Sequence, residues 1–331
     1  MPRFSVIIVN YNAGPRLAKC LRHLAAQTVA PVETIVYDNA SDDGSIGALA
    51  DDFPEVTVVH GDSNIGFAAA NNRAAAEAKG DWLVFLNPDA YAQPDWLEAI
   101  AAGIEDYPDI AAFGSLQLDD ADPSRVDGAG DVYHAVGLAY RGHFQQLRDT
   151  APGVGECFAP CAAAAAYRRD TFESLGGFDE RFFCYCEDVD LGFRLRLAGG
   201  RAAQLPSAVV RHEGSAVTGR HSDFTVYHGT RNRIWMAYKN TPGLLYWPIL
   251  PLQVLFNLVM FVRAIATGCG PAFARGMRDG YGGLVELNSE RRAQQRDRKV
   301  AIADIARTMA WSPGKLLSRG ANIWPINTPS D

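Results

Sequence analysis

The sequence lacks the glycine-rich loops of the commonest nucleotide-binding folds. The segment at 10–14, NYNAG, follows the first expected strand and offers a single glycine, so no GxGxxG fingerprint is present there, and no Walker loop occurs. In dinucleotide-binding folds such a turn brings a pyrophosphate against a helix N-terminus. A dinucleotide-dependent dehydrogenase is therefore disfavoured, although side chains at strand ends can still hold a nucleotide.

The chain also lacks a positive charge excess and the cysteine spacings of a zinc protein. Its formal net charge is -7 over 331 residues, whereas domains that bind nucleic acid through their overall field usually carry a basic excess. The six cysteines form no paired CxxC motifs and no CxxC with a histidine pair, which argues against a zinc site. We expect no nucleic-acid partner and mostly buried thiols.

A secretory signal is missing from the start of the chain, because the strand-like segment FSVIIVN already begins at residue 4. We therefore expect a cytoplasmic protein, in which disulfides do not persist. The composition, 48% hydrophobic and 21% charged, is that of an ordinary globular protein.

The first hundred residues contain an alternation of strand-like and helix-like segments. Short runs rich in β-branched residues lie at 4–10, 33–39, 56–60 and 81–87, and amphipathic stretches lie between them at 16–27, 45–53 and 67–80. This alternation is typical of an α/β, Rossmann-like, mostly parallel sheet with helices on both faces.

The rest of the chain is less regular and then becomes helical. Further strands are expected at 111–118, 162–168 and 207–212, with a helix over 187–198. We expect one catalytic domain over residues 1–220, with a nucleotide-binding half at about 1–110 and an acceptor half at about 110–220. Residues 221–331 are expected to form a helical C-terminal extension.

Polar residues follow three of the expected strands, at Asn10–Asn12, Asp38–Asn39 and Asn87–Asp89. Open α/β sheets bind ligands at the carboxyl ends of their strands, so these residues predict one binding site. Asp38 is placed to hydrogen-bond a base or ribose, or it caps the polar turn that follows; the residues alone leave both interpretations open.

Asp89 is a stronger candidate. It follows the apolar run 82–86, and Pro88 ends that strand's hydrogen-bond ladder. A carboxylate here is a ligand of the kind Mg²⁺ or Mn²⁺ takes when the ion also binds a diphosphate. The alternative is a cap for a helix expected near Pro94. We favour the metal ligand.

A second acidic cluster lies in residues 184–199, CYCEDVDLGFRLRLAG. Glu187, Asp188 and Asp190 fall in the first turn of the expected helix, where the helix dipole favours negative charge. Asp190 can pair with Arg194 one turn later, which would fully explain it. Alternatively, the aromatic residues before the Glu-Asp pair place one carboxylate in a partly dry pocket as a general base.

His212 ends the expected strand at 207–212. It is either a strand-end histidine without a task or a metal ligand. A neutral imidazole binds divalent ions well and would shift the preference toward Mn²⁺.

Taken together, these segments resemble glycosyltransferase family 2, and within it the rhamnosyltransferase-like enzymes of cell-envelope polysaccharide assembly. The resemblance covers about residues 3–240 in the right order. The segments that carry it are FSVIIVNYN at 4–12, DNASDDGS at 38–45, NIGFAAANNRA at 64–74, FLNPDA at 85–90, LGGFDERFF at 175–183, EDVDLGFRLRLAG at 187–199 and His212.

This resemblance implies a GT-A fold and an inverting reaction. It also implies a divalent metal, Mn²⁺ or Mg²⁺, a dTDP- or UDP-sugar donor, and a glycan or lipid-linked acceptor. Asp89 matches the last acid of the family's DxD motif, while Asn87 stands where the first acid is expected. His212 matches the metal position near the diphosphate.

The resemblance also implies roles around the sugar and the nucleotide. Asp188 matches the catalytic base, and Glu187, its neighbour in the Glu-Asp pair, is expected as a second catalytic residue. Asp38 matches the acid that contacts the nucleotide. Further residues expected around the base, ribose and phosphate are Tyr11, Asn64 and Arg73.

Three other classes compete with this interpretation. Processive synthases related to the family carry a QxxRW element, which is missing from HGTRNRIWMAY at 228–238, so we expect transfer of one or a few sugars. A sugar nucleotidyltransferase would need a glycine-rich basic loop after the first strand, and NYNAGPR at 10–16 is a poor one. The third class is a non-catalytic sugar-binding protein.

Residues 244–262, LLYWPILPLQVLFNLVMFV, are just long enough to span a bilayer. We expect Pro248, Pro251 and the polar Gln253 and Asn257 to interrupt a spanning helix. The segment therefore suits peripheral contact with the inner face of the cytoplasmic membrane, aided by the basic stretch at 291–299. The alternative is a core helix of the soluble protein.

Overall fold

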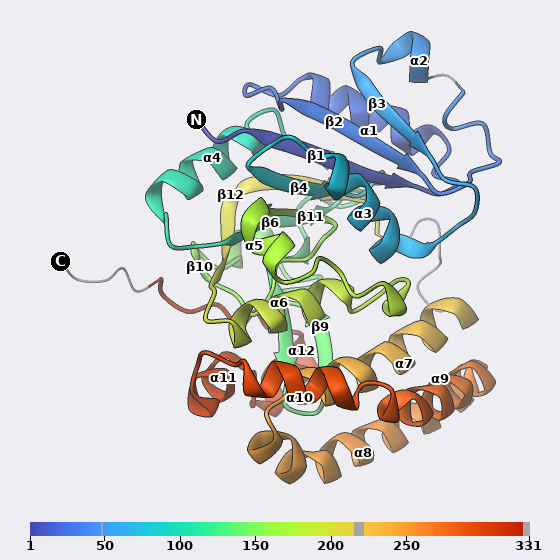
Figure 1. Cartoon of the computed structure of the whole chain (residues 1–331), viewed down its shortest axis with the longest axis vertical. Helices are drawn as coiled ribbons and strands as arrows, with labels where there is room; N and C mark the ends of the chain where they lie inside the picture. The colour runs from blue at the N-terminus through green and yellow to red at the C-terminus, as the bar shows by residue number, and fades with distance from the viewer. Residues whose placement is uncertain (48, 215–221, 327–331) are drawn as a thin grey trace.

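A computed structural model describes residues 1–47, 49–214 and 222–326. In this part of the chain a ten-stranded sheet forms the centre of the molecule (Figure 1). Its main path runs β10 (Gly155–Glu156), β12 (Ala202–His212), β6 (Ala112–Asp119), β11 (Ala164–Arg168), β4 (Trp82–Leu86), β1 (Phe4–Asn10), β2 (Glu33–Asp38), β3 (Val56–His60). Two short strands extend it, β5 (Ala90–Ala92) on β12 and β7 (Val126–Gly128) on β6.

The sheet is mixed but mostly parallel along the half that contains the N-terminus. Strands β4, β1, β2 and β3 are mutually parallel, and β12 is parallel to β6. Strand β11 runs antiparallel to both of its neighbours and joins these two parallel groups. The predicted α/β fold is confirmed. The alanine run at 162–166 did not show that the strand formed there would be antiparallel.

Both faces of the sheet are apolar, as its sequence requires. In β1, Phe4, Val6 and Ile8 pack into the core on one face, and Ile7 and Val9 pack into the core on the other. Successive side chains of a strand point to opposite faces, so a strand buried on both sides is a continuous apolar run. Because both faces of β1 are buried, residues 6–9 are all apolar, and a polar residue follows only at Asn10.

Helices cover the two faces of the sheet (Figure 1). One face packs against α1 (Pro15–Ala25) and α4 (Trp96–Asp106), and the other against α3 (Gly66–Glu77), α5 (Arg169–Ser174) and α6 (Glu187–Leu197). The helix expected over 45–53 is shorter, α2 (Leu49–Asp52), and residue 48 lies outside the described residues.

The C-terminal region is helical, as expected. Its helices are α7 (Asp223–Asn240), α8 (Gly243–Ala266), α9 (Gly270–Gly282), α10 (Asn288–Arg296), α11 (Ile302–Thr308) and α12 (Pro313–Ser318). They pack below the sheet in Figure 1, with α8 at the far end of the molecule.

A shared apolar core joins these helices to the sheet domain. Tyr133, Phe158 and Phe193 pack in one cluster with Met236 and Tyr246. A separate hairpin, β8 (Asp131–His134) and β9 (Leu138–Arg141), contributes Tyr133. No strand pattern in the sequence predicts this hairpin. It extends from the sheet toward the C-terminal helices.

Candidate active site

Two predicted donor-site residues lie at the carboxyl ends of adjacent strands. Asn10 ends β1 and is paired in register with Asp38, the last residue of β2. The buried Asp38 carboxylate accepts from Asn10 Nδ2 at 3.2 Å and from the backbone N–H of Ser41 at 3.3 Å. Asp38 thus caps the turn that follows it, as one of the two interpretations predicted. Tyr11, the next residue after β1, is 40% exposed.

Asn64 lies at the start of α3 and is linked to the same strand ends. Its Oδ1 accepts from Asn39 Nδ2 at 2.8 Å and from the backbone N–H of Gly66 at 3.0 Å. Gly66 has φ +87, and a Cβ there would lie 2.6 Å from Phe183, so only glycine fits this turn. Arg73 is exposed about two turns further along α3, and within the described residues it makes no hydrogen bond or ion pair.

Asp89 and His212 come together because β5 and β12 are antiparallel neighbours. His212 pairs in register with Ala90, the residue after Asp89. Both side chains are buried, and His212 Nε2 lies 3.3 Å from Asp89 Oδ1. Residues 123 positions apart in the sequence therefore form one polar site at the sheet edge. Asn87 lies two residues before Asp89 and is partly exposed.

The other ring nitrogen of His212, Nδ1, contacts residues that the sequence did not predict. This atom lies 2.7 Å from Asp127 Oδ2, and Arg141 Nη1 contacts the same carboxylate oxygen. Burial opposes a charge on His212, but the hydrogen bonds to Asp127 and Asp89 outweigh it and raise the pKa of His212 to about 9. A carboxylate behind a histidine is the usual arrangement for fixing a metal-binding imidazole.

The donor set at this edge fits a divalent metal. His212 Nε2 is buried and lies 3.3 Å from Asp89 Oδ1, and a divalent ion bound between them would take the place of the proton on Nε2. An imidazole nitrogen and a carboxylate oxygen aimed at the same point suit Mn²⁺ or Mg²⁺ with further oxygens from a diphosphate.

The second acidic group lies at the N-terminus of α6. Glu187 is 5% exposed, and its Oε2 has no hydrogen-bond partner among the described residues. Asp188 is partly exposed; its Oδ2 accepts from the backbone N–H of Ala162 at 3.2 Å. Burial and the charge of Asp188 raise the pKa of Glu187 well above its usual range, and burial also raises the pKa of Asp188.

Asp190 has the structural role that the sequence predicted. Its Oδ2 accepts from Arg194 Nε at 2.8 Å, and its Oδ1 lies 2.7 Å from Lys239 Nζ. All three side chains are buried. Of the three acids in the first turn of α6, Asp188 is the one that is partly exposed.

The loop before Asp188 is strained and is held by one side chain. Phe183, Tyr185 and Cys186 have φ values of 63, 74 and 67, a conformation that costs roughly 1–2 kcal/mol for a residue with a Cβ. The buried Asn232 of α7 donates through Nδ2 to the carbonyls of Phe182, Cys184 and Tyr185, at 2.9, 2.8 and 2.8 Å. These bonds fix the backbone that presents the Glu-Asp pair.

Several site residues had no clear signal in the sequence. Asp127 and Asp131 flank the glycines of VDGAGD at 126–131, which looked irregular. Asn232 sits within an amphipathic helix and resembled an ordinary polar position. Cys161 lies partly exposed beside Asp188, and all six cysteines are free thiols, half of them buried.

Comparisons with known proteins agree on the family. Residues 5–176 match the sequence model of Glycosyl transferase family 2. The chain is 33% identical over 243 residues to the N-acetylglucosaminyl-diphospho-decaprenol L-rhamnosyltransferase of Mycobacterium tuberculosis H37Rv, covering 65% of this chain and 77% of that protein. It is 31% identical over 218 residues to the O-antigen chain rhamnosyltransferase WbaN of Salmonella anatum, covering 64% and 66%.

Solved structures with the same fold are glycosyltransferases. The mannosyltransferase PcManGT from Pyrobaculum calidifontis, in complex with GDP-Man and Mn²⁺, aligns with TM-score 0.55 and 22% identity over 93% of this chain and 87% of that one. GalNAc-T7 with UDP, GalNAc and Mn²⁺ aligns with TM-score 0.60 and 18% identity over 72% of this chain and 48% of that one. The likeness supports the predicted GT-A fold.

Proposed function

This chain belongs to glycosyltransferase family 2, and from that premise we propose that it transfers a sugar with inversion from a nucleotide sugar to a lipid-linked glycan acceptor in cell-envelope polysaccharide assembly. The observation that carries the proposal is that two different polar sites lie next to the carboxyl end of β4: Asn87, two residues before Asp89, donates to the carbonyl of Ala163, and the neighbouring Ala162 N–H donates to Asp188. One pairs Asp89 with His212, and the other presents Asp188 at a helix N-terminus. The relatives named as rhamnosyltransferases make rhamnose the first donor sugar to test.

The base in this mechanism is Asp188. It accepts the proton of the acceptor hydroxyl while that oxygen attacks the anomeric carbon from the face opposite the nucleotide. The bond between the anomeric carbon and the diphosphate oxygen breaks, and its electron pair leaves with the nucleoside diphosphate. A single displacement needs only one base, and the buried Glu187 is not required for it.

The donor is held at the strand ends in this proposal. Asp38, Tyr11 and Asn64 contact the nucleoside, and Asp89 and His212 would hold the divalent ion. When bound, that ion supplies positive charge against the departing diphosphate. Asp127 keeps the His212 ring turned so that Nε2 faces Asp89.

A donor panel tests the proposed function. Thermal shift with dTDP-rhamnose, UDP-galactose, UDP-glucose and GDP-mannose, each with and without Mn²⁺, should single out one nucleotide sugar. That sugar nucleotide should then release nucleoside diphosphate in the presence of an acceptor. Release of pyrophosphate from a sugar phosphate and a nucleoside triphosphate would indicate a nucleotidyltransferase instead, and binding without any release would indicate a sugar-binding protein.

We also propose that α8 attaches the enzyme to the membrane that holds a lipid-linked acceptor. Within the described residues α8 is the one helix long and apolar enough to cross a bilayer, and 22% of its most apolar stretch is buried. Its exposed side chains are almost all apolar, and Arg263 is its single charged residue. They include Leu244, Trp247, Leu252, Val254, Leu255, Leu258, Val259, Val262 and Ile265.

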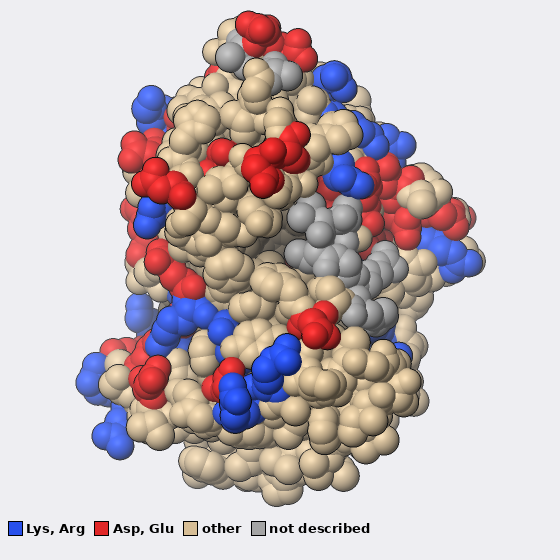
Figure 2. All heavy atoms as spheres, turned by 90° about the vertical axis from the view of Figure 1, so that its right-hand side faces the viewer, with Lys and Arg blue, Asp and Glu red and all other residues tan. Residues whose placement is uncertain are grey.

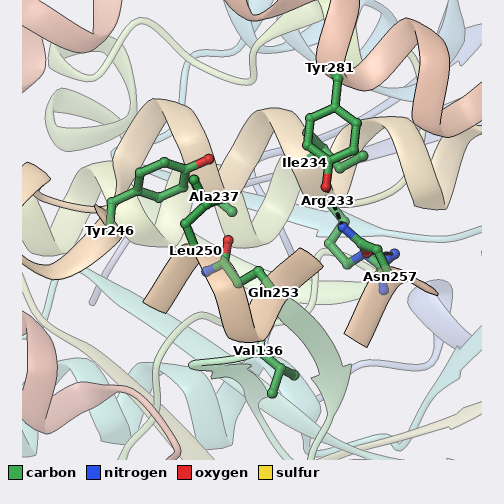
Figure 3. Close-up of a pocket in the computed structure, with 10 residues that line it drawn as sticks. Val136, Arg233, Ile234, Ala237, Tyr246, Leu250, Gln253, Asn257 and Tyr281 are labelled. Carbon is green, nitrogen blue, oxygen red and sulfur yellow. Dashed lines mark hydrogen bonds between the residues drawn. The ribbon is translucent and has the colours of Figure 1, made fainter. Parts of the chain in front are cut away.

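The polar residues of α8 face the protein. Gln253 Nε2 donates to the carbonyl of Ala135 at 3.2 Å. Asn257 lies beside Arg233 of α7 in Figure 3, and its Oδ1 accepts from that buried guanidinium at 2.6 Å. Asn257 Nδ2 also donates to Tyr281 at 2.9 Å. This arrangement is the reverse of an ordinary surface helix, which buries its apolar face. It suits a helix lying flat on a bilayer.

One expectation about this region is corrected. The helix is not interrupted, because it continues through Pro248 and Pro251, and both prolines are exposed. The basic stretch at 291–299 is not wholly exposed, since Arg291 is buried against the rings of Tyr238 and Tyr246. Membrane contact therefore rests mainly on the apolar face.

The end of the molecule that carries α8 shows almost no Lys, Arg, Asp or Glu in Figure 2. Substituting Leu255, Leu258 and Val262 by Gln should release the protein from liposomes in a flotation assay, because it removes the apolar face without touching a buried contact. Val32→Gln, at a residue 48% exposed before β2, is the matched control. Equal flotation of the triple variant and the control would contradict the membrane role of α8.

A further inference from the structure

Asp131 is a buried acid that faces the proposed base. It begins β8, is 4% exposed, and has a carboxyl oxygen within 4.8 Å of a carboxyl oxygen of Asp188. The Cys161 Sγ lies within the same 4.8 Å of both of these carboxyl oxygens. Two carboxyl groups can hydrogen-bond each other only if one of them carries a proton.

The backbone holds Asp131 firmly in this position. Its N–H donates to the carbonyl of Ala159 at 2.8 Å, and it pairs across the hairpin with Arg141. Gly130 before it has φ +74, and a Cβ there would lie 2.7 Å from Cys157. The turn that aims Asp131 at Asp188 therefore depends on glycine.

The surroundings decide which acid keeps the proton. Arg141 is the cation that faces Asp131, and its guanidinium also contacts Asp127. The other titratable groups around the Asp131–Asp188 pair are neutral or acidic: Glu187, Cys157, Cys161, Cys184, Cys186 and Tyr167. With so little positive charge nearby, the more deeply enclosed acid is the one that stays neutral.

We propose that Asp131 is a positioning residue for the catalytic base: as a neutral carboxylic acid it donates a hydrogen bond to Asp188, keeps Asp188 ionised and fixes which of its oxygens meets the acceptor. This inference rests on the proposed function, in which Asp188 is the base. During transfer the acceptor proton moves to Asp188, while the Asp131 proton stays on Asp131.

The electrostatic directions agree with this assignment. Burial and the charge of Asp188 raise the pKa of Asp131 well above its ordinary value. Burial also raises the pKa of Asp188, but backbone N–H groups and the hydrogen bond from Asp131 act in the opposite direction. Asp188 is thereby kept available as a base at a lower pH than burial alone would allow.

The pH dependence of turnover tests the inference. Asp131→Ala removes the donor, so the acid limb of the kcat/KM profile should move to higher pH by about one pH unit. Asp131→Asn keeps a neutral donor and should restore the limb to near the wild-type position. A downward movement in Asp131→Ala, as expected if Asp131 were ionised, or no movement, would overturn the proposal.

Infrared difference spectroscopy supplies a test that needs neither turnover nor the alanine variant. At neutral pH the wild type should show a protonated carboxylic acid band that Asp131→Asn lacks. Glu187→Gln is the control for the neighbouring acid. If Asp131→Asn instead removes carboxylate bands, the proposal is overturned. Mn²⁺-dependent changes in those bands would point to a cation bridging Asp131 and Asp188, which also contradicts it. If the wild type transfers no sugar, the proposed function fails while this measurement still decides the protonation of Asp131.

Discussion

The two acidic groups of the site differ in what surrounds them. Asp89 and Asp127 enclose a histidine, and Arg141 contacts Asp127, so negative and positive groups alternate. Asp188 instead lies beside the acids Glu187 and Asp131. The first arrangement suits a charged ligand such as a metal diphosphate, whereas the second raises carboxyl pKa values and suits proton transfer. We infer a division between donor binding and base catalysis, which substitutions can separate.

The largest effect is expected at Asp188. Asp188→Asn keeps the shape of the side chain but cannot accept a proton, so kcat should fall on the order of 10²-fold or more. Donor affinity, measured by calorimetry in the presence of Mn²⁺, should stay near the wild-type value. Near-normal turnover in this variant would move the base to another residue and end the proposed division.

The metal side should show the opposite pattern. Asp89→Ala and His212→Ala should each weaken binding of the donor by about 10- to 100-fold with Mn²⁺ present and much less in EDTA, because a ligand contributes only when the ion is bound. Asp127→Asn should give a smaller loss of the same kind. Equal losses with and without metal would indicate direct donor contacts or misfolding.

Asn232 tests whether the strained loop positions the base. Asn232→Ala removes the donor shared by three loop carbonyls, so the loop should relax and kcat should fall by about tenfold or more. Donor affinity should change little. Asn257→Ala removes a buried amide of α8 that bonds Arg233 and Tyr281 but no carbonyl of the loop, and it is the control; a similar loss of kcat there would make the effect one of general stability.

The smallest effect on turnover is expected at Glu187. The folded protein raises the pKa of Glu187, so its contribution to stability is fully present below the unfolded-state pKa and is lost as pH rises through the folded-state pKa. Glu187→Gln stays neutral, so relative to wild type its Tm should rise with increasing pH, by about 2 °C. Turnover should stay within about threefold. A large loss of kcat would instead assign Glu187 to the chemistry.

Strands β1, β2 and β4 of the N-terminal half could be predicted because burial on both faces leaves a continuous apolar run, and the partly exposed β3 could be predicted from its β-branched residues. The runs at 4–10, 33–38, 56–60 and 82–86 are strands as expected. The polar strand ends also predicted one site, and Asp89 and His212 do meet there. In contrast, the hairpin β8–β9 has only four residues in each strand, too few for a periodic pattern to stand out.

The residues that support the site could not be predicted from the sequence for a related reason. Asp127 and Asp131 act through contacts made by long-range strand pairing, and a single sequence does not give that pairing. Asn232 acts on a loop 47 to 50 positions away in the chain. The roles of Tyr11, Asp38, Asn64 and Arg73 in donor binding stay predictions; Arg73, exposed on α3, needs a donor-bound structure to be assigned.

The anomeric configuration of the transferred sugar decides whether Asp188 acts as a lone base. If Asp188 is a lone base and the Asp89–His212 site only holds the donor, each transfer is one displacement, and NMR of the product made with the best donor should show a configuration opposite to that of the donor. A product that retains the donor's configuration would require a different mechanism and would contradict the account.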